Sequence, residues 1–330
     1  MRAIIQTAYG APEQVLTLAE VEPPTPARGE VLIRTRATTV NTPDWVTVTG
    51  TPWALRLRFG LTRPPSPIRG ADIAGVVEAV GAGVTDLQPF DAVFGSAWTN
   101  TLATPGTYCE LAVARDIQLI RKPDALSFEE AASAVTSGLT AMIGLYQVAK
   151  VQPGQRVLIN GASGGVGTFA VQMAKAMGGH VTAVCSARNE VLVRSLGADA
   201  VIDYNREDFT QGDARYDVIL DNVMNHPPGR TARALAPGGL FMPNSVGNSG
   251  GWFAGLPRMA RAWAMGLTGT RVGFITCVLS RENLTALAEL LVSGGIRVVI
   301  DRTVPLEQAA EAVAYMLTHR ARGQIAISVG

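Results

Sequence analysis

The feature that most constrains the fold is a glycine-rich turn between a short apolar strand and a helix. The apolar run at 156–160 (RVLIN) leads into Gly161-Ala162-Ser163-Gly164-Gly165-Val166-Gly167 and a helical pattern over about 167–177. Glycines at such a turn let the backbone approach a pyrophosphate, and Gly167 permits close packing of helix on strand. The positive end of the helix then faces the phosphates. The turn predicts a dinucleotide site; taken alone, with Ala162 at its first glycine position, it is also compatible with a turn that binds nothing.

Strands and helices alternate after this turn. Further strands are expected at 180–185, 200–203, 216–221 and 239–243, with helices at about 188–196 and 227–235 between them. Ser127 and Glu130 form a capping-box pattern that opens an Ala-rich helix ahead of the first strand. Alternation of this kind argues for an α/β domain with a parallel, doubly wound sheet and right-handed crossovers.

The flanking segments have a different pattern. Residues 1–122 contain short β-like runs and turn residues, which are typical of a compact β-rich domain with partly barrel-like closure. After the α/β region we expect a strand at 271–276, a helix at 281–293, a short strand near 297–301, a helix at 307–319 and a last strand at 324–329. We therefore predict an α/β domain at 123–268 inserted into a β-rich domain made of 1–122 and 269–330.

Composition excludes several classes of protein. A chain of 330 residues with 47% apolar and 17% charged residues can bury two cores and is not disordered. The net charge is +1 and the charges are interspersed, so the basic stripe of a nucleic-acid binder is missing. Three scattered cysteines do not form a disulfide framework. No apolar run reaches the roughly 18 residues of a membrane span, and the N-terminus does not resemble a signal peptide. We expect a cytoplasmic protein without an integral membrane segment.

The end of the second strand of the α/β domain indicates which dinucleotide binds. An NAD site usually places Asp or Glu there to bond the ribose 2′-hydroxyl. Here the strand ends Cys185-Ser186-Ala187-Arg188-Asn189, without an acid. Ser186 and Arg188 can both donate to a 2′-phosphate. The pattern favours NADPH over NADH, and the alternative for Arg188 is a solvated arginine at a helix start.

Motifs along nearly the whole chain resemble the medium-chain dehydrogenase/reductase superfamily, in its zinc-free quinone oxidoreductase branch. They are Asn41-Thr42-Pro43-Asp44, Gly70-Ala71-Asp72-Ile73-Ala74-Gly75-Val76-Val77, Leu139-Thr140-Ala141, the glycine turn, Leu196-Gly197-Ala198-Asp199 with Ala200-Val201-Ile202-Asp203-Tyr204, and Gly323-Gln324-Ile325-Ala326-Ile327. Two further stretches, Thr268-Gly269-Thr270-Arg271-Val272 and Arg281-Glu282-Asn283-Leu284, are similar to the subgroup that contains plant chloroplast-envelope quinone oxidoreductase homologues and mitochondrial reticulon-interacting proteins.

The resemblance implies a Rossmann domain inserted in a GroES-like domain, NADPH bound between them, and a homodimer. It also implies reduction of quinones or α,β-unsaturated carbonyls by direct hydride transfer. Zinc-dependent relatives carry Cys where Asn41 stands, Gly-His-Glu where Gly70-Ala71-Asp72 stands, and a four-cysteine lobe near 90–110, where this chain has only Cys109. A catalytic zinc needs about three protein ligands, so we expect none.

The resemblance also assigns site residues. Asn41 is the candidate catalytic residue, orienting substrate or the nicotinamide carboxamide; its alternative is an Asx-turn residue. The residues implied to bind NADPH, alongside Asn41, are Thr140, Ser163, Gly164, Gly165, Val166, Gly167, Ser186, Arg188, Tyr204, Ser245, Val246 and Phe274. Core or generic packing is the alternative for Thr140, Tyr204 and Phe274.

Two other functions stay open at this point. Asn41-Thr42-Pro43-Asp44 resembles the N-P-x-D turn of the superfamily. Enoyl-thioester reductases of the superfamily carry a proton-donating tyrosine shortly after this turn, where this chain has Gly50-Thr51-Pro52-Trp53. Trp53 is then either a stacking surface for a flat substrate or a buried anchor. The second alternative is a non-catalytic protein that binds NADPH as a sensor or in a structural role. The segment 252–266 (WFAGLPRMARAWAMG) is compatible with core packing, a lid, an interface helix or a membrane-surface helix.

Overall fold

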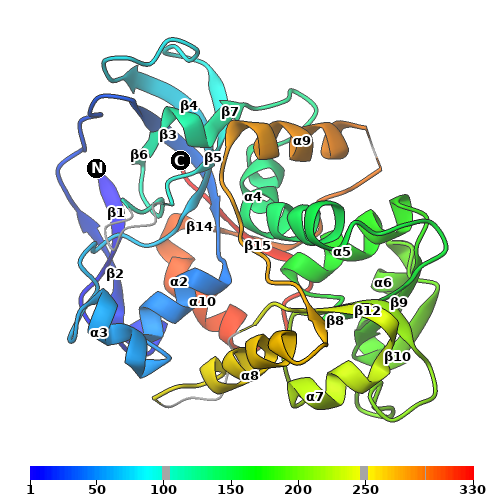
Figure 1. Ribbon diagram of the computed structural model, residues 1–330. Coiled ribbons are helices and arrows are strands. Elements are labelled where there is room, and N and C mark those ends of the chain that lie inside the picture. The colour runs from blue at the N-terminus through cyan, green and yellow to red at the C-terminus, as the bar shows by residue number, and fades with distance from the viewer. Residues whose placement is uncertain (99–104, 246–251, 294) are drawn as a thin grey trace. The chain divides into compact units, whose positions relative to one another are not determined.

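The computed structural model describes residues 1–98, 105–245, 252–293 and 295–330. The described chain divides into two compact units. Unit 1 comprises Met1–Leu139, the segment that begins at Val278, and Ile300–Gly330, whereas unit 2 comprises Thr140–Cys277 and Gly295–Val299. Unit 2 is thus inserted into a unit built from both ends of the chain, whose elements run from blue through cyan to blue-green and from orange to red in Figure 1.

Unit 1 contains a small two-stranded sheet and a larger mixed sheet. Within the described residues the larger sheet has the order β14-β15-β3-β4-β5-β7, and β6 pairs with β3. The C-terminal strand β15 lies antiparallel to β3, so the two ends of the chain build one sheet. The strands are β1 (Arg2–Gln6), β2 (Leu16–Glu20), β3 (Glu30–Thr39), β4 (Asp72–Val80), β5 (Ala92–Ser96), β6 (Leu111–Arg115), β7 (Leu119–Arg121), β14 (Ile300–Pro305) and β15 (Gln324–Ser328).

The helices of unit 1 cover one part of this β structure. α10 contacts α1, α2 and β2. The capping box predicted at Ser127 and Glu130 is confirmed, since each residue's backbone N–H donates to the other's side chain, at 2.9 and 3.1 Å. The helices are α1 (Pro12–Val15), α2 (Thr42–Thr49), α3 (Arg56–Phe59), α4 (Phe128–Met142), α9 (Arg281–Val292) and α10 (Ala309–Leu317), with short helices at Trp53–Leu55, Asp116–Gln118 and Leu306–Gln308.

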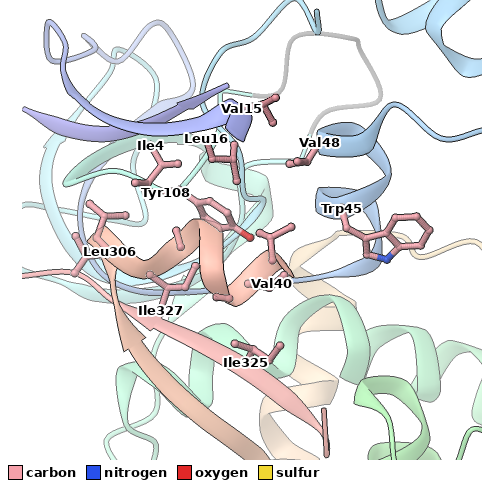
Figure 2. Close-up of a cluster of buried hydrophobic side chains, with 14 residues drawn as sticks. Ile4, Val15, Leu16, Val40, Trp45, Val48, Tyr108, Leu306, Ile325 and Ile327 are labelled. Carbon is pink, nitrogen blue, oxygen red and sulfur yellow. The ribbon is translucent and has the colours of Figure 1, made fainter. Parts of the chain in front are cut away.

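A hydrophobic core joins the two ends of the chain within unit 1. Ile4 and Leu16 from the first two strands pack in one cluster with Trp45 of α2 and with Ile325 and Ile327 of β15 (Figure 2). All of these side chains are at most 7% exposed. Burial of this extent is the main driving force for docking the C-terminal segment on the N-terminal one.

Unit 2 is built on a parallel sheet. Its described strands follow the order β10-β9-β8-β11-β12-β13, and every neighbouring pair is parallel. The strand order reverses between β8 and β11, and in such sheets ligands bind outside the carboxyl ends of the strands at this reversal. The strands are β8 (Arg156–Asn160), β9 (His180–Cys185), β10 (Ala200–Asp203), β11 (Tyr216–Asp221), β12 (Leu235–Pro243) and β13 (Arg271–Val272).

Four α-helices accompany this sheet in the described part of unit 2. They are α5 (Gly165–Ala176), α6 (Glu190–Ser195), α7 (Pro228–Thr231) and α8 (Leu256–Leu267). Short helical turns lie at Ala187–Asn189 and Ala232–Ala234, and a π-helical turn at Ile143–Ala149 continues α4. None of the helices in the described ranges combines the length and apolarity that a membrane crossing needs.

The predicted Rossmann-type sheet is confirmed. The expected strands at 156–160, 180–185, 200–203 and 216–221 coincide with β8 to β11. Two expectations were less accurate. β13 covers only Arg271–Val272 of the expected 271–276, because it pairs with just Leu240 and Phe241 of β12. The strand expected near 297–301 is β14, at Ile300–Pro305.

The compact units divide the chain later than the predicted domains do. The divisions fall after Leu139 and after Cys277, whereas the sequence placed them after residues 122 and 268. α4 explains the first difference, because this continuous helix begins in unit 1 and ends in unit 2. A helix gives no sequence signal at the point where its contacts change from one unit to the other.

Candidate cofactor site

The glycine turn is held in a shape that only glycine allows at two positions. Gly161 has φ +76°, in the left-handed region that favours glycine. At Gly167 an added Cβ would lie 2.2 Å from the carbonyl oxygen of Gly161, so any side chain there would push α5 away from β8. The close helix–strand packing predicted for Gly167 is therefore present.

The N-terminus of α5 has the properties of a phosphate-binding site. Gly164 is the N-cap and no side chain caps the helix. The first helical hydrogen bond runs from the Thr168 N–H to the Gly164 carbonyl, at 2.9 Å. The N–H groups of Gly165, Val166 and Gly167 come before it and have no acceptor within the helix. A Cβ at Gly164 would meet only one atom within 4 Å, the Gly161 carbonyl oxygen at 3.5 Å, so the backbone is open on that side of the N-cap.

Ser163 is connected to the tip of the next strand by Asn189. The Asn189 amide Nδ2 donates to Ser163 Oγ at 2.8 Å. Asn189 is buried, and no atom in the described chain bonds its Oδ1. Because Ser163 Oγ accepts this bond, the hydroxyl hydrogen is directed elsewhere and can donate to a phosphate oxygen. Sequence reasoning missed Asn189, which was read only as part of the strand tip.

Ser186, Arg188 and Tyr204 gather at the carboxyl end of β9. Ser186 is half-buried at the start of the turn Ala187–Asn189, and Arg188 is exposed on that turn. The Tyr204 N–H donates to the Cys185 carbonyl at 3.2 Å, and its side chain is 58% exposed. The side chains expected to bind the adenosine end thus lie on adjoining strand ends, and the generic packing alternative for Tyr204 does not fit its exposure.

An acid that sequence reasoning did not weigh lies beside this tip. Asp203 ends β10 and is paired in register with Cys185. The Asn205 N–H and amide, together with the Ala187 N–H, hold the pKa of Asp203 below its ordinary value. Asp203 is therefore an anion, and its Oδ1 already accepts two hydrogen bonds from Asn205, one from the backbone N–H at 3.1 Å and one from the side-chain amide at 2.9 Å. Arg206 lies 3.8 Å from it and reduces its repulsion of a nearby phosphate.

Polar residues link the strand ends at the point where the strand order reverses. Asn160 of β8 donates to Asp221 of β11 at 2.8 Å, and Asn244 donates to Asn222 at 2.8 Å. Burial raises the pKa of Asp221, and no bond within the described residues reaches its Oδ2. These residues were also missed. A polar residue closing an apolar strand, as in RVLIN and YDVILD, is the signal that could have found them.

The remaining predicted residues of unit 2 are distributed around the same sheet. Ser245 is half-buried and follows Asn244, whose N–H donates to the Asp221 carbonyl at 2.9 Å. Phe274 is 39% exposed beyond β13, and Thr140 is buried in the last turns of α4. Val246 lies outside the described residues.

Asn41 belongs to unit 1, where hydrogen bonds hold both its backbone and its side chain. It is the N-cap of α2, and its backbone N–H donates to Asp44 Oδ2 at 2.7 Å. Its side-chain Nδ2 donates to Asp72 Oδ2 at 2.8 Å. Asp72 also accepts from Thr136, through the backbone N–H at 2.9 Å and the hydroxyl at 2.8 Å. The Asn41 amide is thus held in one orientation, with one of its two hydrogens used on Asp72.

Both acids around Asn41 are deeply buried. Burial raises the pKa of Asp72 to about 6, in spite of the bonds from Thr136 and Asn41. Burial likewise raises the pKa of Asp44 to about 7. The buried Arg69 opposes this shift at Asp44. A carboxyl pair with such values changes its charge close to neutral pH.

The structure also bears on the metal and on Trp53. In the described parts of the chain no three His, Cys, Asp or Glu side chains gather as metal ligands would. Trp53 is 44% exposed, with the Arg56 guanidinium 5.7 Å from its ring centre. The alternative of a buried hydrophobic anchor does not fit this exposure.

Two family models match the chain. The alcohol dehydrogenase GroES-like domain matches residues 27–124, which confirms the expected GroES-like fold of unit 1. A model described as a zinc-binding dehydrogenase matches residues 196–327.

Similar proteins extend this match to nearly the whole chain. The chloroplast envelope quinone oxidoreductase homolog of Arabidopsis thaliana is 30% identical over 99% of this chain and 98% of its own length. The mitochondrial NAD(P)H oxidoreductase RTN4IP1 of Mus musculus is 34% identical over 79% of this chain and 70% of its own. The Escherichia coli quinone oxidoreductase complexed with NADPH has a TM-score of 0.82 at 26% identity, over 99% of this chain and 100% of that one.

Proposed function

Because the chain belongs to the medium-chain dehydrogenase/reductase superfamily as a quinone-oxidoreductase-like member, we propose that it uses NADPH to reduce quinones or α,β-unsaturated carbonyls by direct hydride transfer, without a metal. The observation that carries the proposal is the uncapped N-terminus of α5 next to Ser186 and Arg188. The first binds a diphosphate and the second a 2′-phosphate.

When bound, NADPH supplies a hydride from its nicotinamide to the acceptor. The residues of this chain bind and orient. The Gly165, Val166 and Gly167 N–H groups hold the pyrophosphate with the Ser163 hydroxyl, which Asn189 turns toward it. Ser186 and Arg188 hold the 2′-phosphate, and the exposed Tyr204 ring packs at the adenosine end. Ser245, Val246, Phe274 and Thr140 are proposed to line the nicotinamide.

Asn41 is proposed to orient the substrate or the carboxamide with its amide. The bond to Asp72 keeps that amide from rotating, so its second hydrogen points in a set direction. Such a donor lowers the barrier by favouring the negative charge that develops on a carbonyl oxygen. The proposal does not require zinc, because Asn41 stands where zinc-dependent relatives carry a cysteine.

The preference for NADPH rests on charge. Arg188 is the exposed cation at the β9 tip, and the Asp203 carboxylate beside it is occupied by N–H donors and Arg206. The Escherichia coli protein of this fold was solved with NADPH, which is consistent with this choice. The cytoplasm and the homodimer stay predictions; the two relatives named above are a chloroplast envelope and a mitochondrial protein.

The test is a panel of acceptors, each with NADPH and NADH side by side. Simple quinones and enones should be reduced, and NADPH should have the lower KM. Faster turnover of an acyl-thioester than of any quinone or simple enone would favour the enoyl-thioester reductase. NADPH binding without oxidation against the whole panel would favour a non-catalytic sensor or structural protein.

A further inference from the structure

α8 presents an apolar face to solvent. Its inner side packs on unit 2, where Ala262 is fully buried and Met259 contacts the core cluster around Phe241. The outer side carries exposed residues at helical spacing: Pro257, Ala260, Trp263, Ala264 and Leu267. Trp263 is 59% exposed and Leu267 is 70% exposed. Core packing therefore accounts for the apolar residues on the inner side of α8 but not for those on its outer side.

The apolar face continues at the start of the helix. Trp252 and Phe253 are 60% and 58% exposed, and the Phe253 carbonyl accepts the Leu256 N–H at 2.9 Å, which ties it to the first turn of α8. We call this surface the α8 face and define it by the four large exposed side chains Trp252, Phe253, Trp263 and Leu267. Clustered exposed aromatic residues of this kind mark a surface that contacts something else.

The segment that carries the α8 face holds charge of one sign. Residues 222–277 contain five arginines and no Asp, Glu or Lys, although the whole chain carries a net charge of only +1. Arg261 lies on the exposed side of α8, and Arg258 is turned inward to the Met224 carbonyl. Arg230 is neutralised by Asp208, 2.5 Å away. The arginines near the helix are Arg258, Arg261 and Arg271.

These observations select among possible partners. A second copy docking through the same segment would bring two acid-free segments together, so neither would offer the other's Arg261 a carboxylate. An acidic protein would satisfy the arginine but would not explain a face of tryptophan, phenylalanine and leucine. Tryptophan, phenylalanine and leucine on one side with arginine at the flank is the composition of helices that lie in the plane of a membrane interface.

We propose that the α8 face binds anionic lipid bilayers peripherally, with Trp252, Phe253, Trp263 and Leu267 entering the interface and Arg261 contacting lipid phosphates. A protein bound in this way reaches acceptors that are dissolved in the bilayer and poorly soluble in water. The membrane contact does not depend on the proposed function, because it is measured by binding alone.

The test is co-sedimentation of the full chain with vesicles. Binding is expected with phosphatidylglycerol mixed into phosphatidylcholine, weaker binding with phosphatidylcholine alone, and loss of the difference at high salt. An arginine near an anionic surface contributes about fivefold to partitioning, so Arg261→Glu should lower it by about thirtyfold. Trp263→Ser should lower it by at least about fivefold, since an interfacial tryptophan is lost.

Matched controls separate the α8 face from general stickiness. Val191→Ser removes an apolar side chain that is 82% exposed on α6 of the same unit, and Arg28→Glu reverses an exposed charge in unit 1. Both should bind vesicles like the parent chain. Equal losses in controls and α8 variants would overturn the proposal.

Other outcomes replace it with a different role. If Trp263→Ser leaves vesicle binding unchanged but dissociates an oligomer in sedimentation velocity, the face is a contact between copies. If it changes only the turnover of water-soluble acceptors, the helix acts as a lid. Either result rejects the membrane contact.

Discussion

The bond between Asn189 and Ser163 offers a sharp test of how the glycine turn holds phosphate. In Asn189→Asp the new carboxylate accepts the Ser163 hydroxyl, so the hydroxyl no longer donates to the cofactor. The bond is 2.8 Å long, which places the new charge next to the turn. Loss of a bond to a charged group costs about 1.5–3 kcal/mol, and repulsion between charges about 6 Å apart adds up to about 3 kcal/mol. The NADPH Kd should rise by at least about tenfold from the lost bond alone, and further from the repulsion.

Asn189→Ala separates positioning from charge. It removes one bond to Ser163 together with a buried Oδ1 that accepts no hydrogen bond from the described residues, so the melting temperature should hardly move. The Ser163 hydroxyl is then free to rotate, and the NADPH Kd should rise by about fivefold. Gln155→Glu is the control: it adds a charge beside the opposite end of β8, where its oxygen can still accept the Gln152 N–H as Gln155 does at 2.9 Å.

The measurement is an NADPH titration by calorimetry. It compares Asn189→Asp, Asn189→Ala, Ser163→Ala and the double variant that combines Asn189→Ala with Ser163→Ala. If Asn189 acts through Ser163, the double variant binds about as weakly as Ser163→Ala alone. Additive losses would refute the reasoning, as would Asn189→Asp binding NADPH within about twofold of the parent.

Four other predictions follow from the site. Arg188→Ala should raise the KM for NADPH by about 10- to 100-fold and leave that for NADH nearly unchanged; equal effects on both would reject the 2′-phosphate role. Asn41→Ala should cut turnover at least about tenfold with little change in NADPH affinity, and a parental rate would reject its role as a donor. Gly167→Ala should lower the unfolding free energy by about 1–3 kcal/mol, whereas Gly229→Ala, which meets no atom within 4 Å, should not. The pKa of about 7 means that between about pH 4 and 7 folded Asp44 keeps a proton that the unfolded chain has lost, so its contribution to stability falls as pH rises through that range. Asp44→Asn should therefore reduce the change of the urea midpoint with pH over this range, and an unchanged pH dependence would contradict this.

Much of unit 2 could be predicted because its strands are apolar runs closed by turn residues. A run such as 156–160 has one buried partner strand on each side, so its ends coincide with β8. Among the described residues β13 pairs with β12 alone, and its pattern runs on into coil, so its end could not be predicted from the sequence. The change of unit within α4 was hidden for a related reason, since one helical pattern covers both parts.

The positions of some site residues could be predicted from local patterns, although their roles stay predictions. The glycine turn and the acid-free strand tip led to Ser163 and Arg188, which the structure brings to adjoining strand ends. Asn189 and Asp203 were missed because their importance depends on which strand ends are neighbours. Asp203 comes beside Cys185 only through the β9–β10 pairing, and no local pattern shows this.

Direct hydride transfer from NADPH without a metal is tested with NADPH that carries deuterium at both C4 positions of the nicotinamide. After treatment with a zinc chelator the protein is mixed with this cofactor and an α,β-unsaturated ketone, and the product is examined by mass spectrometry and NMR. Direct hydride transfer without zinc predicts saturated ketone with deuterium on the β-carbon, formed as fast as before the chelator was added. Deuterium absent from that carbon, or a reaction that stops with the chelator and returns with zinc, would contradict it.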